Sequence, residues 1–158
     1  MRGPKVWRIV CALLLIANLT FIWGNSLLEG KKSAKMTTAV VQMDKSVRSK
    51  SVDEVKTIRR IVRKSAHVLE FASLGLLLAW GCQMADVTGV SLYTLPPFGG
   101  LTAACIDETI QHFVPGRSSE LMDVWVDAAG VLIGMILFFV GYHVWKKLKN
   151  YFITEVTT

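Results

Sequence analysis

The chain has 158 residues, of which 52% are hydrophobic and only 19% are charged, and its formal net charge is +6. This composition excludes an ordinary soluble domain and is typical of an integral membrane protein. The positive charge suits anionic lipid headgroups. A nucleic-acid partner is not expected, because the chain has no zinc-finger spacing, RNA-binding signature or stripe of base-stacking aromatic residues.

Four apolar segments predict four transmembrane helices, because each has about the 20 residues that a bilayer crossing requires. The first segment follows a short basic stretch, as a signal peptide does, but no small-x-small cleavage site follows Trp23, so we expect an uncleaved helix. Pro96 and Pro97 suit the first turn of the third helix. The four spans are expected at about residues 6–28, 66–84, 93–114 and 124–145.

These segments predict an all-α membrane protein, a four-helix antiparallel transmembrane bundle that forms a single domain over residues 1–158. Residues 29–65 are polar and rich in Lys and Arg. Within this segment valine and isoleucine recur at roughly helical spacing with basic residues between them, which predicts a basic amphipathic helix on the membrane surface that leads into the second span. A solvated loop with partial helicity is the alternative.

Polar residues lie at one end of three of the predicted spans. Because antiparallel helices alternate in direction, the start of the second span, the end of the third and the start of the fourth face the same side of the membrane. Ionisable groups are costly at membrane depth and are kept there by pairing, water or function. These polar residues form one shallow layer on that side of the membrane. Lys64 and Arg117 lie where they can cover it, and Arg117 follows a Pro-Gly turn. The predicted pocket residues are His67, Glu70, Asp107, Glu108, Gln111, Arg117, Asp123 and Asp127.

His67, Glu70 and Glu108 are the candidate catalytic residues. His67 and Glu70 share a helix face at i,i+3 spacing. They are interpreted as a general base with its orienting carboxylate, as two metal ligands, or as a buried hydrogen-bonded pair that locks two helices together.

The remaining candidates are ligand-binding residues: Lys64, Asp107, Gln111, Arg117, Asp123 and Asp127. The pocket has more carboxylates than fixed cations, so either one carboxyl is protonated or the pocket binds a divalent cation. Asp107 and Glu108 share a proton or a cation in one interpretation, and pair with Arg117 or Lys64 in another. Arg117 either grips a phosphate or carboxylate in a bidentate manner or pairs with Glu108 or Asp123.

Two motifs in the chain resemble the VanZ-like family of bacterial membrane proteins. They are RKSAHVLEFASLGLLL at residues 63–78 and DETIQHFVPGRSSELMDVWVDAAGVLIG at residues 107–134. The resemblance implies a small multi-span protein of the bacterial cytoplasmic membrane and a link to glycopeptide resistance, since the family's namesake is associated with teicoplanin. The family often has Asn where this chain has Asp127. The residues that carry over from the family are His67, Asp107, Glu108, Gln111, Arg117 and Asp123.

Together these observations predict a cell-envelope protein whose outward-facing pocket binds a lipid headgroup, a lipid-linked phosphate or a glycopeptide. The alternative is a small membrane enzyme that acts on a lipid-linked phosphate or ester through His67, Glu70, Glu108 and Arg117. A transporter ranks last, because the polar residues lie on one side of the midplane only. We expect both termini in the cytoplasm, although a count of basic residues favours the reverse.

Overall fold

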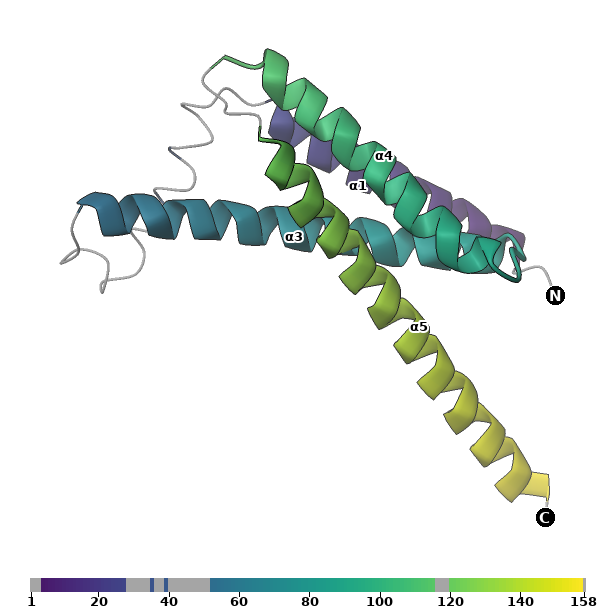
Figure 1. Ribbon diagram of the computed structural model, residues 1–158. Coiled ribbons are helices and arrows are strands. Elements are labelled where there is room, and N and C mark those ends of the chain that lie inside the picture. Colours follow the sequence, from purple (N-terminus) through teal and green to yellow (C-terminus); the bar gives the residue numbers. More distant parts are fainter. Residues whose placement is uncertain (1–3, 28–34, 36–38, 40–51, 116–119, 158) are drawn as a thin grey trace.

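The computed structural model covers the whole chain, and its described part comprises residues 4–27, 35, 39, 52–115 and 120–157. This part is helical and contains no strand. Its helices are α1 (Lys5–Ser26), α3 (Val52–Met84), α4 (Ser91–Phe113) and α5 (Leu121–Thr157). Successive helices run in opposite directions, with α1 beside α4 and with α5 crossing α3 (Figure 1). The predicted all-α, four-helix class is therefore confirmed.

Three of these helices are long and apolar enough to cross a membrane: α1, α3 from Asp53 and α5 as far as Ile153. Their outer faces carry large exposed apolar side chains, among them Leu69 and Trp125, which are 71% and 65% exposed. Such continuous apolar surface is unusual for a soluble monomer and fits contact with lipid. The helix α4 has 23 residues but carries polar side chains at its end. That α4 also crosses the membrane stays a prediction.

The helix α3 joins the end of the polar segment to the second predicted span without a break. The solvated-loop alternative is therefore wrong for residues 52–65, which are helical. Most of the predicted amphipathic segment, residues 29–51 other than 35 and 39, lies outside the described residues. That the basic part of α3 lies on the membrane surface stays a prediction.

Two boundaries differ from the sequence-based expectation. Pro96 and Pro97 lie inside α4 rather than in its first turn, because the helix already begins at Ser91. Proline is tolerated inside membrane helices where neighbouring groups satisfy the freed backbone carbonyls. At the other end of the chain, α5 continues to Thr157 instead of ending near residue 145. Residues 146–157 contain three Lys and no Gly or Pro, so no helix-breaking residue ends the helix there.

Glycines let α5 approach the backbone of α3 closely. A Cβ atom added to Gly130 would lie only 2.7 Å from the carbonyl oxygen of Val68. One added to Gly134 would collide with the carbonyl oxygen of Ala72. Gly130 and Gly134, which form a GxxxG pair, therefore pack within the chain against α3. The adjoining apolar core, which includes the fully buried Phe71 of α3, holds the helices at the level of the polar side chains.

Candidate functional site

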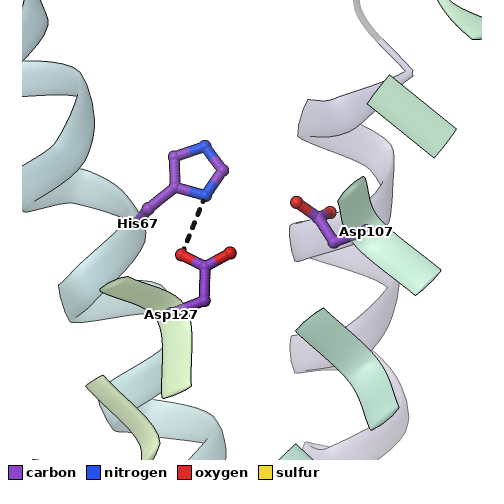
Figure 2. Close-up of side chains that lie close together, drawn as sticks. All are labelled: His67, Asp107 and Asp127. Carbon is purple, nitrogen blue, oxygen red and sulfur yellow. Dashed lines mark ion pairs between the residues drawn. The ribbon is translucent and has the colours of Figure 1, made fainter. Parts of the chain in front are cut away.

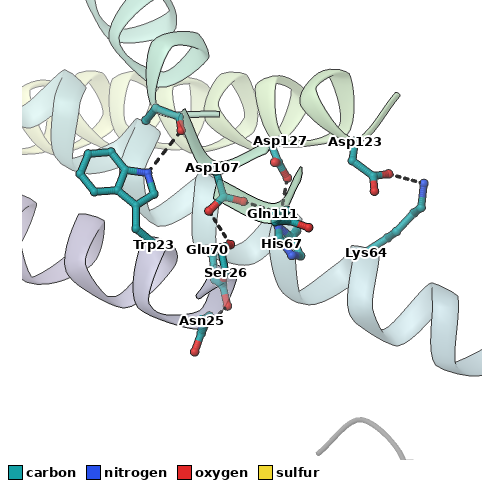
Figure 3. Close-up of polar contacts among 11 residues, drawn as sticks. Trp23, Asn25, Ser26, Lys64, His67, Glu70, Asp107, Gln111, Asp123 and Asp127 are labelled. Carbon is teal, nitrogen blue, oxygen red and sulfur yellow. Dashed lines mark hydrogen bonds and ion pairs between the residues drawn. The ribbon is translucent and has the colours of Figure 1, made fainter. Parts of the chain in front are cut away.

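Polar side chains from all four described helices meet at one end of the bundle (Figure 3). Of the candidate site residues, Lys64, His67, Gln111, Asp123 and Asp127 line one small cavity, whereas Glu70 and Glu108 have hydrogen-bond partners outside it. Arg117 lies outside the described residues. The buried polar side chains are Ser26, Asp107, Glu108, Gln111 and Asp127.

Asp107 is the centre of a hydrogen-bonded group between α1 and α4. The Ser26 hydroxyl donates to Asp107 Oδ1 over 2.5 Å, and the Gln111 amide Nε2 donates to Asp107 Oδ2 over 2.7 Å. Both carboxylate oxygens are thus held by donors, although the side chain is fully buried. Hydrogen bonds of this kind offset the cost of burying a carboxylate and fix its orientation.

His67 of α3 pairs with Asp127 of α5. The His67 Nδ1 atom lies 3.5 Å from Asp127 Oδ1, and the Asp127 side chain is only 1% exposed. Neither oxygen of Asp127 accepts a hydrogen bond from any described residue. A buried carboxylate without donors is rare and costly, so this pair is the least satisfied part of the site.

Glu70 points toward α1 rather than toward His67. Its Oε1 atom accepts a hydrogen bond from the Asn25 amide over 3.0 Å. Glu70 is therefore hydrogen-bonded to α1, while the carboxylate within ion-pair distance of the His67 ring is that of Asp127. Residues at i,i+3 on a helix differ in direction by about 60°, enough for the two side chains to reach different neighbouring helices.

Asp107 and Glu108 also diverge. Glu108 Oε1 accepts a hydrogen bond from the backbone N–H of Glu120 over 2.6 Å, where α5 is about to begin. The two neighbouring carboxylates share no hydrogen-bond partner among the described residues. Glu108 instead fixes the end of the connection between α4 and α5.

Basic residues of α3 form the rim of the site. Lys64 Nζ lies 2.6 Å from Asp123 Oδ1, and Arg60 lies 2.9 Å from Glu120 Oε1. Below this rim is a small cavity of about 10 Å³, which is roughly the room that one water molecule needs. Its lining residues are Arg63, Lys64, His67, Gln111, Asp123, Val126 and Asp127.

The sequence analysis missed the contribution of α1. Asn25 and Ser26 contact Glu70 and Asp107, but neither was counted among the site residues. A signal was present: both polar residues lie in the last turn of the first span, and in an antiparallel arrangement this turn adjoins the start of the second. The end of α1 thus belongs to the same polar layer.

The fold and the site define a helical membrane protein with a buried polar cluster at one end of its helices. Residues 9–143 of the chain match the sequence model of the VanZ/LLP1 protein family. The chain therefore belongs to the VanZ/LLP1 family, which confirms the resemblance seen in its motifs. No curated protein and no solved structure matches the chain.

Proposed function

We propose that the chain is a cell-envelope protein that binds the anionic headgroup of a membrane lipid or of a lipid-linked phosphate. One observation carries this proposal: Lys64 borders both the polar cavity and an open groove of about 460 Å³ on the outer side of α3. Arg60 also lines this groove, and the rest of its lining is mostly apolar, with Ile61, Val68 and Leu69. A ligand with a phosphate at one end and a hydrocarbon chain at the other fits this arrangement.

The ion pairs at the rim leave donors for such a ligand. A lysine ammonium has three N–H donors and a guanidinium has five, so a single carboxylate contact does not saturate Lys64 or Arg60. Arg63, which lines the cavity, has no carboxylate within ion-pair distance in the described part of the chain. These groups supply the charge that a phosphate requires, while the apolar groove accommodates its chain.

Lipid retained by the purified protein tests this proposal. We expect wild-type protein, purified in mild detergent, to retain anionic phospholipid in native mass spectra. Lys64→Gln should reduce this retention about 10-fold or more, because a charge-assisted hydrogen bond contributes about 1.5–3 kcal/mol. Lys56→Gln is the matched control, since Lys56 lies on the same helix and pairs only with the exposed Asp53 among described residues. Equal retention by both variants would contradict the proposal.

We further propose that the pocket opens to the outside of the cytoplasmic membrane and that both termini lie in the cytoplasm. A pocket that serves an envelope ligand, including one that contributes to glycopeptide resistance, must face that ligand. The basic turns of α3 can meet anionic headgroups on either leaflet. We therefore expect an alkaline phosphatase fused after Thr158 to be inactive and a fluorescent protein at the same position to be bright. An active phosphatase would show that the C-terminus lies outside and that the pocket faces the cytoplasm.

A membrane hydrolase is the second candidate, favoured by the contact between His67 and Asp127. The His67 Nδ1 atom faces the Asp127 carboxyl group at 3.5 Å, and its other ring nitrogen would act as the general base. In this candidate His67 activates a water molecule in the cavity, and the rim cations hold the phosphate of a lipid-linked substrate. His67→Ala would then abolish phosphate release from such a substrate while lipid retention persists. If His67→Ala left phosphate release unchanged, the hydrolase role would be excluded and the binding role would remain.

A further inference from the structure

Three potential metal ligands from three helices meet below the rim. His67 of α3, Asp107 of α4 and Asp127 of α5 each offer one ligand atom, and these atoms lie within 4.8 Å of one another. Figure 2 shows the Asp127 carboxylate directed at the His67 ring and the Asp107 carboxylate facing the pair from the neighbouring helix. The helices bring together residues that are 20 or more positions apart in the sequence, so the cluster is a product of the fold.

Asp127 is a buried carboxyl group without a hydrogen-bond donor among the described residues. Its side chain is 99% buried, yet neither of its carboxylate oxygens accepts a hydrogen bond from a described residue. The His67 Nδ1 atom is 3.5 Å from Asp127 Oδ1, beyond the usual range of a charged hydrogen bond. A buried carboxyl of this kind is either protonated or paired with a positive charge, and a bound metal ion would supply that charge.

The basic side chains around the cavity do not hydrogen-bond Asp127. Lys64 pairs with Asp123 and Arg60 with Glu120 at the rim, while Arg63 lines the cavity without donating to either Asp127 oxygen. Asp107 adds a second buried carboxylate to the cluster and is itself held by two neutral donors, Ser26 and Gln111.

We propose that His67, Asp107 and Asp127 bind one divalent transition-metal ion of the Zn²⁺ or Mn²⁺ type. One imidazole nitrogen with two carboxylate oxygens suits these ions better than Mg²⁺ or Ca²⁺, which prefer oxygen ligands alone. Ligands about 2.0–2.2 Å from one ion lie at most about 4.4 Å apart, so a small rotation of one carboxylate closes the site. The adjoining cavity, lined by Gln111, leaves room for a water ligand.

The hydrogen bonds to Asp107 have the form expected around a metal site. Carboxylates that bind metal ions are commonly held by donors that fix their direction, and Ser26 and Gln111 do this from two sides. This site stands on the geometry of the three side chains and does not depend on the lipid proposed above. The lipid groove lies on the outer side of α3, and only Lys64 is common to the groove and the cavity.

Metal content of the full-length protein tests the proposal. The protein is purified in detergent without chelators or nickel resin, and its metals are measured by inductively coupled plasma mass spectrometry. We expect about one Zn²⁺ or Mn²⁺ per chain, bound at purification or after addition and desalting. His67→Ala and Asp127→Leu should reduce this content at least 10-fold. His143→Ala and Asp53→Leu are matched controls, because both residues are exposed and lie outside the cluster.

A second measurement uses the unmodified chain and does not depend on the folding of any variant. Treatment with EDTA should lower its melting temperature, and added Zn²⁺ or Mn²⁺ should restore it. Added Mn²⁺ should also give the broadened electron paramagnetic resonance spectrum of a protein-bound ion. Sub-stoichiometric metal after loading, or full metal content in His67→Ala, would overturn the site. Anionic lipid retained by metal-free protein would leave the lipid proposal intact, so the two proposals fail separately.

Discussion

Gly134→Leu is expected to abolish a stable folded state, whereas Gly141→Leu on the same helix should be tolerated. Any side chain at Gly134 runs into the carbonyl oxygen of Ala72 and the backbone of Leu76, which cannot rotate away as a side chain does. The helices α3 and α5 must therefore separate. Overpacking a well-fitted core costs about 1–3 kcal/mol even when side chains can adjust, and here the obstacle is backbone.

Gly141 provides a matched control because no described atom lies within 4 Å of the position that its Cβ would take. We expect Gly134→Leu to elute from a sizing column as aggregate, or to melt at least about 5–10 °C below wild type in detergent. Gly141→Leu should melt within a few degrees of wild type. Equal melting temperatures for the two variants would show that the close crossing of α3 and α5 is not required.

Asp107→Ala is expected to destabilise the chain by about 3–5 kcal/mol, because it removes two charge-assisted hydrogen bonds from a buried site. The Ser26 hydroxyl and the Gln111 amide would lose the acceptor that each now uses. Asp107→Asn should cost less, since the amide oxygen still accepts one of the two bonds. Ser26→Ala should lie between Asp107→Asn and wild type.

Thermal unfolding in detergent, monitored by intrinsic fluorescence, measures these differences. Asp53→Ala is the matched control: it removes the same side chain from a position that is 92% exposed and pairs with Lys56 on the helix surface. Its expected effect is within about 0.5 kcal/mol of zero. If Asp107→Ala melted together with this control, the hydrogen-bonded group at Asp107 would contribute nothing to stability.

The helices and the location of the site could be predicted from the sequence because they depend on local patterns. Hydropathy and length locate the spans, and the alternation of antiparallel helices brings the ends that carry His67, Asp107 and Asp127 to one side. The order of the spans alone brings these ends together, whatever the rotation of each helix about its axis.

The pairing of individual side chains depends on that rotation and on the crossing geometry, which the sequence does not specify. Glu70 lies near His67 in sequence, yet it contacts Asn25 of α1, while Asp127 takes the place expected for Glu70. The rotation is set by the close approach of Gly130 to Val68, a contact between helices that are far apart in the chain. Likewise, the length of α5 depends on the absence of a stop signal after residue 145.

The unbroken helix α3 makes bilayer thickness relevant to the geometry of the site. At 1.5 Å per residue its 33 residues extend about 50 Å, well beyond the roughly 30 Å of the hydrocarbon layer. Hydrophobic mismatch of this kind is relieved by tilting the helix or by placing one end among the headgroups. His67 moves with α3, whereas Asp107 belongs to α4. We therefore expect a thinner or thicker membrane to change the separation of these two side chains, so that lipid composition alters the geometry of the site from a distance.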